Sequence, residues 1–423
     1  MFLVKHHSDS TLMQTAKMEY SLNRASRENE TNLLCKLPEE LVENVAAFLG
    51  AGDTGIEDLC ALRLTCAHLY EKSLHYFGRV VLHTVRTDLG FISLERLMKL
   101  AGDNRLKDHV HHLLIRGVPN SSMGLGFQWT RHDSGQLDVE QSPGARWLRD
   151  ILLSFPNCRS FTVHLDYGWN DSSEHCRLGP SDGITIIMDI VAETGIPVRS
   201  FSVYAHPSSS GFAFNDVDPR CLQFDILKDP AFINSWAQVE KLKFHHNFVP
   251  GNIGEWVASV ITLAPRLKTL EIGFDYTPDA QVITTRLSSG PVVLSELREL
   301  ALTEASEIEW DELLTLLRFT CRTLRCLTLQ RLQLKGGTWI PLLAQLYQFP
   351  LLEDLTLFWL STSQKRVLHF VSLPKSLHGT LQGGKLKLDR KQFRGIWRTV
   401  YVAYRGHDMQ VLLNALLQSA RDD

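Results

Sequence analysis

An apolar motif that recurs along most of the chain constrains the fold more than any other feature of the sequence. The motif has the form apolar-x-x-apolar-x-apolar, and its second apolar residue stands at positions 242, 270, 300, 327 and 355 in five consecutive copies, which are therefore 28, 30, 27 and 28 residues apart. Less regular copies precede them, with this residue at 113, 161 and 201 and spacings of 48, 40 and 41 residues. Such a repeat predicts a stack of similar units, none of which can bury its apolar face alone.

Each copy predicts a helix followed by a short strand. The end of the motif alternates between apolar and other residues, as in a strand buried on one side. Helical periodicity precedes the strand at residues 147–155, 184–192, 253–263, 313–319 and 339–347, and proline often separates the two, where it blocks further helix. The units resemble leucine-rich repeats of an irregular type. The resemblance implies an α/β fold, a leucine-rich-repeat-like solenoid or horseshoe over residues 79–390.

The rest of the chain is assigned from composition and periodicity. Residues 1–32 are polar and expected to form a mobile tail. Residues 79–83 are expected to form a short strand, and Leu386 and Leu388 to belong to a weak last copy of the repeat. Residues 393–404 and 409–420 are predicted to be helical, so that residues 391–423 form a helical cap on the last unit.

Residues 33–78 predict a small helical module. Pro38 suits the start of a helix, since its missing N–H would be unpaired there, and Glu39 and Glu40 favour the positive end of the helix dipole. An apolar stripe at helical spacing follows until Gly50, and a second helical segment runs over residues 58–70. Two or three short helices cannot close a private core, so an outside partner is expected to cover part of their surface.

The order Leu-Pro-x-Glu-Leu-Val-x-x-Val, a loop, and Asp-Leu-x-x-Leu-Arg-Leu-x-Cys resembles the F-box. Together with the repeats, this pattern is similar to that of F-box proteins of filamentous fungi. The resemblance implies binding to the Skp1-type adaptor of cullin-RING ubiquitin ligases and, through it, to a cullin. The positions that match the adaptor-facing pattern are Leu37, Pro38, Leu41, Val42, Val45, Leu59, Leu62, Leu64, Cys66 and Leu69.

The sequence departs from the F-box pattern in three places. Leu69 stands about where a tryptophan is common, Thr65 stands where valine is usual, and the loop at residues 50–57 is longer than the commonest form. An alternative interpretation is a helical hairpin that only caps the following domain.

The residues between the apolar positions of each strand are expected to point away from the core and to form a target-docking face. This face consists of Arg116, His164, Tyr204, Lys243, His245, Glu271, Thr303, Gln330 and Phe358. On the long early loops, Trp129, Trp169, Phe212 and Phe214 are candidate anchors for the same target. The alternatives are that the strand residues are simply solvated and that the loops fold back onto the repeats.

Composition excludes several classes of function. A net charge of −3 and a pI near 6.6 give no basic footprint for nucleic acid or anionic membrane, and no apolar run reaches the length of about 20 residues that a membrane span needs. We therefore expect a cytoplasmic or nuclear protein whose eight scattered cysteines are reduced thiols. No catalytic or cofactor motif is present, and Cys158, His164, His175 and Cys176 do not have zinc-site spacing.

These observations predict a non-catalytic substrate receptor of an SCF-type ubiquitin ligase. The F-box-like module would bind the Skp1-type adaptor and the solenoid would bind an unknown target protein. A non-degradative interaction scaffold is the alternative from another class, and an enzyme built on the repeats would need a cleft that no spacing indicates.

Overall fold

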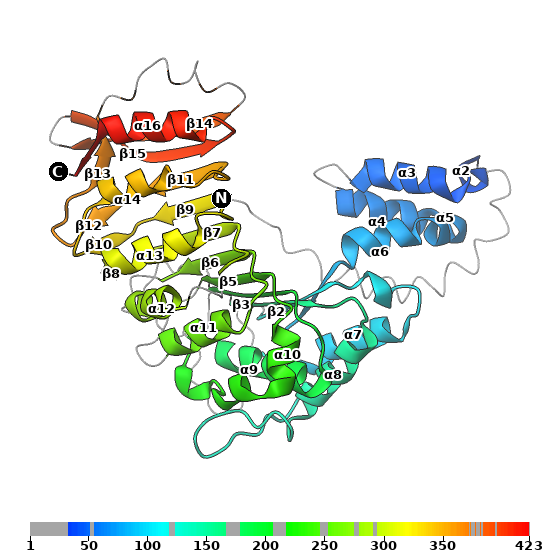
Figure 1. Cartoon of the computed structure of the whole chain (residues 1–423). Coiled ribbons are helices and arrows are strands. Elements are labelled where there is room, and N and C mark those ends of the chain that lie inside the picture. The colour runs from blue at the N-terminus through cyan, green and yellow to red at the C-terminus, as the bar shows by residue number, and fades with distance from the viewer. Residues whose placement is uncertain are drawn as a thin grey trace. The chain divides into compact units, whose positions relative to one another are not determined.

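The computed structural model describes two compact units of the chain (Figure 1). The described residues are 33–50, 55–117, 123–165, 178–205, 217–245, 253–274, 279–290, 294–371, 373, 377, 381, 384–393 and 396–422. Unit 1 takes in the described residues up to 85 together with 99–111 and 154–157, and unit 2 takes in 86–98, 112–153 and those from 158 onward. The expected N-terminal tail lies outside the described residues.

Unit 1 is built mainly from short helices. They are α2 (Leu33–Lys36), α3 (Glu39–Gly50), α4 (Gly55–Thr65), α5 (Ala67–Lys72) and α6 (Leu74–Val81), and the 3-10 turn η1 (Lys107–His109) belongs to the same unit. Pro38 directly precedes α3, and its carbonyl accepts a hydrogen bond of 3.2 Å from the Val42 N–H, which confirms the predicted helix start. The predicted second helix is divided at Cys66, whose extended backbone ends α4 and begins α5.

The strand expected at residues 79–83 is wrong. Its first three residues complete α6, and the Leu82 N–H still donates to the Gly78 carbonyl at 3.0 Å. Phe77 and Val81 are one helical turn apart, and both pack on the core of the module. Helical packing of this pair overrides the β-branched character of the segment.

A buried cation, Arg63, lies beside the apolar core of unit 1. Six buried residues form that core, namely Val42, Ala46, Leu59, Leu62, Cys66 and Leu69. The Arg63 side chain lies next to it, with the guanidinium carbon 4.0 Å from the ring centre of Tyr70 and 4.1 Å from that of Phe77. Its Nη1 also donates to the Tyr70 carbonyl at 3.0 Å. Arg63 therefore joins α4 to α5 and α6.

Unit 2 alternates helices and strands, as predicted from the repeat. In chain order these elements are β2 (His112–Arg116), α8 (Pro143–Ser154), β3 (Ser160–Leu165), α9 (Pro180–Thr194), β4 (Ser200–Ala205), α10 (Pro230–Trp236), β5 (Lys241–His245), α11 (Ile253–Thr262), β6 (Thr269–Gly273), α12 (Asp279–Ser288), β7 (Glu299–Thr303), α13 (Trp310–Thr320), β9 (Cys326–Gln330), α14 (Trp339–Leu346) and β11 (Asp354–Phe358). Within the described part of the chain they contribute to a 13-stranded, mostly parallel sheet in a mixed α/β fold.

The strands β2, β3, β4, β5, β6, β7, β9 and β11 are parallel and lie in sequence order, each paired with its neighbour in the same register. The second apolar residues of the motif stand side by side in one buried row: Leu113, Phe161, Phe201, Leu242, Leu270, Leu300, Leu327 and Leu355. The helices cover this side of the sheet, as the ring contacts of Phe201 with Trp236 on α10 and of Phe244 with Trp256 on α11 indicate. Figure 1 shows α11 to α14 as a row along strands β5 to β11.

The parallel order ends at β11, where the chain departs from prediction. Residues 393–404, predicted to be helical, lie mainly in β15 (Ile396–Arg405), which is antiparallel to both β11 and β14 (Lys385–Phe393). Leu386 and Leu388 belong to β14 and not to another parallel repeat. Val400, Val402 and Tyr404 are buried at every second position, as strand geometry requires. Only α16 (Met409–Ser419) confirms the helical part of the predicted cap.

Three strands of unit 2 are each followed by a turn of the same type. Glu304, Arg331 and Trp359 directly follow β7, β9 and β11, and each has a positive φ of 50–58°. The chain then enters the short strands β8 (Ile308–Glu309), β10 (Gln333–Lys335) and β12 (Ser361–Thr362), which form a second parallel sheet. Left-handed backbone is costly for residues with a Cβ, so its recurrence at equivalent positions means that the second sheet requires this turn.

We predict that Arg63→Ala lowers the free energy of unfolding of unit 1 by about 2 kcal/mol, since it removes two cation–π contacts and leaves the Tyr70 carbonyl without this donor. Hydrogen exchange of the α4–α6 amides in mild denaturant measures the effect. Arg79→Ala is the matched control, since Arg79 is exposed and lies 5.0 Å from the Tyr76 ring, and it should change stability by less than about 0.5 kcal/mol. Equal effects of the two variants would contradict the role of Arg63.

Candidate functional site

Helix α3 carries two apolar stripes, and only one of them is buried. Val42 and Ala46 face the core of unit 1 and are at most 2% exposed. Leu41, Val45 and Phe48 follow each other at i, i+4 and i+7 and are 47%, 36% and 83% exposed. Because this spacing places side chains on one face of a helix, α3 presents an apolar stripe to solvent.

Neighbouring elements add further exposed apolar side chains. Leu33 and Leu34 on α2 are 77% and 44% exposed, and Ile56 and Leu64 on α4 are 56% and 40% exposed. We define the apolar surface of unit 1 as Leu33, Leu34, Leu41, Val45, Phe48, Ile56 and Leu64. Apolar side chains exposed together on one helix face, as Leu41, Val45 and Phe48 are on α3, are typical of a surface that meets another protein.

The structure divides the predicted adaptor-binding residues into two sets. Leu41, Val45 and Leu64 are exposed, as is Pro38, and Leu37 is partly buried. The other five form part of the core of unit 1, where they support the surface without being accessible to a partner: Val42, Leu59, Leu62, Cys66 and Leu69. Sequence reasoning missed Leu33, Leu34, Phe48 and Ile56 as surface residues. The position of Phe48, seven residues after Leu41, is the signal that could have identified it.

The outward face of the sheet in unit 2 brings the predicted target-binding residues together. Seven of them occupy one continuous row across the paired strands: Arg116, His164, Tyr204, His245, Thr303, Gln330 and Phe358. Gly273 fills the position between His245 and Thr303 in this row. Lys243 and Glu271 pair with each other in the adjacent row.

Four side chains of this face form one polar network. The Tyr204 and His245 rings are stacked with centres 5.6 Å apart, and His245 Nε2 lies 2.6 Å from Glu271 Oε1. Lys243 forms an ion pair with the other oxygen of Glu271 and a hydrogen bond with Tyr204. The hydrogen bond from His245 and the ion pair with Lys243 outweigh burial and lower the pKa of Glu271 to about 2. Burial lowers the pKa of Lys243, but its interactions with Glu271 and Tyr204 raise this pKa by a larger amount. The net effect is a raised pKa.

A missing side chain makes room for this network. A Cβ atom on Gly273 would lie 2.7 Å from His245 Nδ1 and 3.1 Å from Thr303 Oγ1. The absence of a side chain there lets the His245 ring lie across the strand beside Glu271.

Charge is segregated along the outward face. The outward positions of β2, β3 and β5 carry cations or histidines, namely His112, Arg116, His164, Lys241, Lys243 and His245. The outward positions of β6, β7 and β11 carry acids, namely Glu271, Glu299 and Asp354. Such a face favours a partner with a complementary charge pattern and disfavours others.

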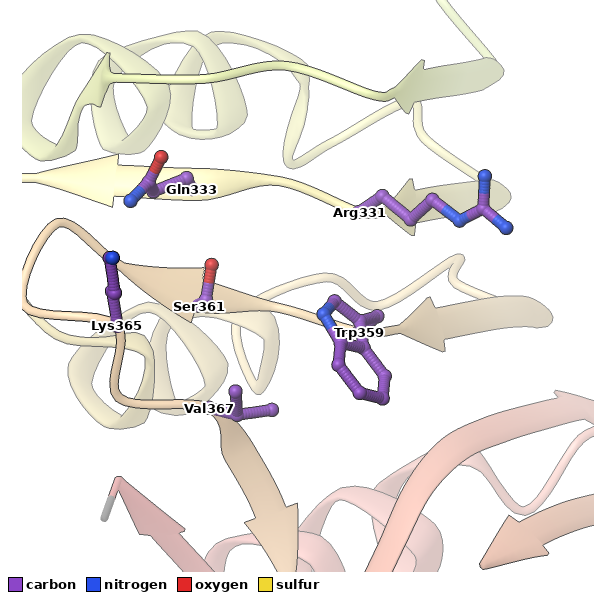
Figure 2. Close-up of a pocket in the computed structure, with 6 residues that line it drawn as sticks. All are labelled: Arg331, Gln333, Trp359, Ser361, Lys365 and Val367. Atoms are coloured by element: carbon purple, nitrogen blue, oxygen red, sulfur yellow. The ribbon is translucent and has the colours of Figure 1, made fainter. Parts of the chain in front are cut away.

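A small groove lies where the second sheet meets the turn before β13 (Leu368–Phe370). Its volume is about 230 Å³, and Arg331, Gln333, Trp359, Ser361, Lys365 and Val367 line it (Figure 2). Figure 2 shows the Arg331 side chain pointing away from Gln333, and its guanidinium pairs with Glu304 at 2.6 Å. The Trp359 ring lies 4.6 Å from the Lys391 ammonium. These groups already interact within the chain, so we assign no ligand to the groove.

The loop aromatics fall into two groups. Trp129 is 5% exposed, and its indole N–H donates to the Gly124 carbonyl at 2.8 Å. Trp129 is therefore buried by its own chain, as the alternative of a loop that folds back predicts, and is not an exposed anchor. Trp169, Phe212 and Phe214 lie outside the described residues.

The residues considered for zinc are only partly described. His164 faces outward on β3 and Cys158 is buried just before that strand, whereas His175 and Cys176 lie outside the described residues. In the part of the chain that the structure covers, no cluster of three or more His, Cys, Asp or Glu side chains is placed to hold a metal ion.

No protein-family model matches the sequence, and a search of curated proteins finds no match. Among the helices of the described residues, none combines the length and apolar character that crossing a lipid bilayer demands.

We predict that Glu271→Gln lowers stability by about 1–3 kcal/mol at pH 7, because it removes the charge that Lys243 and His245 bind. The folded-state pKa of about 2 lies below the ordinary 4.5, so this stabilisation is present above pH 4.5 and is lost as the pH falls toward 2. Thermal melts of both proteins across this pH range should converge at the acid end.

Glu299→Gln, which alters an exposed acid on β7 of the same face, is the control and should have little effect at any pH. A pH-independent difference between wild type and Glu271→Gln would contradict the proposed charge network.

Proposed function

We propose that this chain is a substrate-receptor subunit of an SCF-type ubiquitin ligase. The apolar surface of unit 1 binds a Skp1-type adaptor, and the outward sheet face of unit 2, read as a leucine-rich-repeat-like solenoid, binds the protein to be ubiquitinated. The observation that carries the proposal is the second apolar stripe of α3, Leu41, Val45 and Phe48, which lies on an F-box-like sequence and is exposed.

The energetics of α3 favour a partner. Burying a Leu, Val or Phe side chain contributes about 1.5–3 kcal/mol, so leaving three of them on one helix face forgoes several kcal/mol. The buried stripe of the same helix already anchors α3 to α4, so the exposed stripe is not needed to hold the module together. The opposite face of α3 is already packed in the core of unit 1. The exposed apolar face therefore suits an adaptor whose own apolar residues would bury it.

The features of unit 2 support the second half of the proposal. Its strands are paired in register, so the outward rows form a fixed array of side chains in which charge and aromatic groups have defined positions. A receptor needs such an array to choose one target, and it needs no catalytic group of its own because holding target and ubiquitin carrier together raises their effective concentration.

Adaptor binding is tested by co-purification of the full chain with a Skp1-type adaptor. We predict that Leu41→Glu/Phe48→Glu reduces recovery of the adaptor by at least about tenfold, since two charges replace apolar contacts in the interface. Leu153→Glu is the matched control, because Leu153 is 57% exposed on α8 of unit 2 and should leave recovery unchanged. Equal recovery with both variants, or recovery with neither wild type nor variants, would contradict the assignment.

Target binding is tested with a photo-crosslinking amino acid. Placed at Gln330, in the outward row of β9, it should capture a discrete set of polypeptides in cells; placed at Arg318, exposed on α13 beside the sheet, it should not. The half-life of the captured proteins then separates the receptor from the alternative scaffold. Deletion of the chain should lengthen it for a receptor, and an unchanged half-life would favour the scaffold.

A further inference from the structure

Two cysteines of unit 1 are in direct contact although they are 31 positions apart in the sequence. Cys35 lies on α2 and Cys66 lies between α4 and α5, and their Sγ atoms are 3.4 Å apart. This is hydrogen-bond distance for two thiols, and a covalent S–S bond needs a further approach of about 1.4 Å. The pair lies at the edge of the module core, where Cys66 is 3% exposed and Cys35 is partly exposed.

The two thiols have unequal acidity. Burial raises the pKa of Cys66, but hydrogen bonds from the backbone N–H groups of Leu69 and His68 at the start of α5 outweigh it, so the net direction is downward. The hydrogen bond with Cys66 and burial both raise the pKa of Cys35. Of the two sulfurs, Cys66 is therefore the one that more readily becomes a thiolate.

Helix α2 is held at this place by its own backbone. The Lys72 ammonium donates to the Cys35 carbonyl at 3.1 Å and also to the Leu37 carbonyl, which fixes α2 against α5. No residue of α2 is buried and Cys35 is partly exposed, so a small oxidant can approach the sulfur pair from the side of Cys35. Cys66 is in extended backbone outside both flanking helices, and its side chain can rotate toward Cys35 without breaking a helical turn.

We propose that Cys35 and Cys66 are an oxidation site at which a peroxide forms an intramolecular disulfide that ties α2 to the start of α5. The Cys66 thiolate attacks hydrogen peroxide, an S–O bond forms as the O–O bond breaks, and hydroxide leaves. Cys35 then attacks the sulfenic sulfur of Cys66, the S–S bond forms, the S–O bond breaks, and the oxygen leaves as water with the Cys35 proton. Overall, two thiols and one peroxide yield one disulfide and two waters.

The bridge changes α2 more than any other element. In the reduced protein this four-residue helix is attached by hydrogen bonds and has only exposed or partly exposed side chains. In the oxidised protein a covalent bond closes a loop across α3 and α4, which restricts the unfolded chain and stabilises the module.

The experiment uses the reduced full chain treated with increasing hydrogen peroxide. Free thiols should fall by two at the lowest effective dose, and mass spectrometry after alkylation should find the peptides of Cys35 and Cys66 joined. The oxidised protein should melt at a higher temperature than the reduced one, and dithiothreitol should reverse the shift.

Variants separate this site from the other thiols. Cys35→Ser replaces a partly exposed residue and should abolish both the two-thiol loss and the melting shift, while Cys60→Ser, on α4 of the same module, should retain both. Cys66→Ala serves as a second variant, with circular dichroism to establish that it folds. Oxidation of other cysteines before this pair, or an unchanged two-thiol loss in folded Cys35→Ser, would overturn the proposal.

Discussion

The single register that pairs β2 to β7, β9 and β11 determines on which face of the sheet each side chain of these strands lies. The backbone hydrogen bonds begin just before the strands. The Arg199 backbone N–H donates to the Arg159 carbonyl at 2.7 Å, and the Arg298 backbone N–H donates to the Lys268 carbonyl at 2.8 Å. A shift of one residue in any pair would move apolar residues to the outward face and polar ones into the core. The apolar row beneath the helices therefore fixes the register, and the register in turn aligns the outward row from Arg116 to Phe358.

Unit 1 depends on a different feature, namely that helix α3 has apolar residues on two of its faces and buries only one of them. The inner stripe of α3 packs on α4 and α5 through Val42 and Ala46. Arg63 of α4 stacks on the rings of Tyr70 and Phe77 and so joins α4 to α5 and α6. These contacts leave the outer stripe of α3 uncovered. A module of this size has little apolar surface to spare, and three large side chains of α3 nevertheless stay exposed.

Sequence alone gives the parallel part of the fold because its signal is local and repeated. Each strand repeats the same alternation, and copies at a period near 28 residues reinforce each other. Residues 393–404 carry no such repeated signal. Their apolar residues Ile396, Val400 and Tyr404 have helical spacing, while Val400, Val402 and Tyr404 have strand spacing. Pairing with β11, which is remote in sequence, decides between the two readings.

The candidate sites were only partly predictable for related reasons. The outward residues of the sheet follow from alternation, but the links of Glu271 to Lys243 and His245 require the actual register. Leu41 and Val42 are adjacent in sequence and equally apolar, and only the packing of α3 on α4 separates the exposed residue from the buried one. The contact of Cys35 with Cys66 has no spacing signal, because it arises where two helix ends meet.

The adaptor interface that we propose on the exposed stripe of α3 is tested by hydrogen–deuterium exchange of the full chain with and without a Skp1-type adaptor. We predict that the adaptor slows exchange in peptides covering α2, α3 and α4 and leaves the amides of β2 to β7, β9 and β11 unchanged. Unchanged exchange across residues 33–65, or protection confined to the sheet of unit 2, would contradict it.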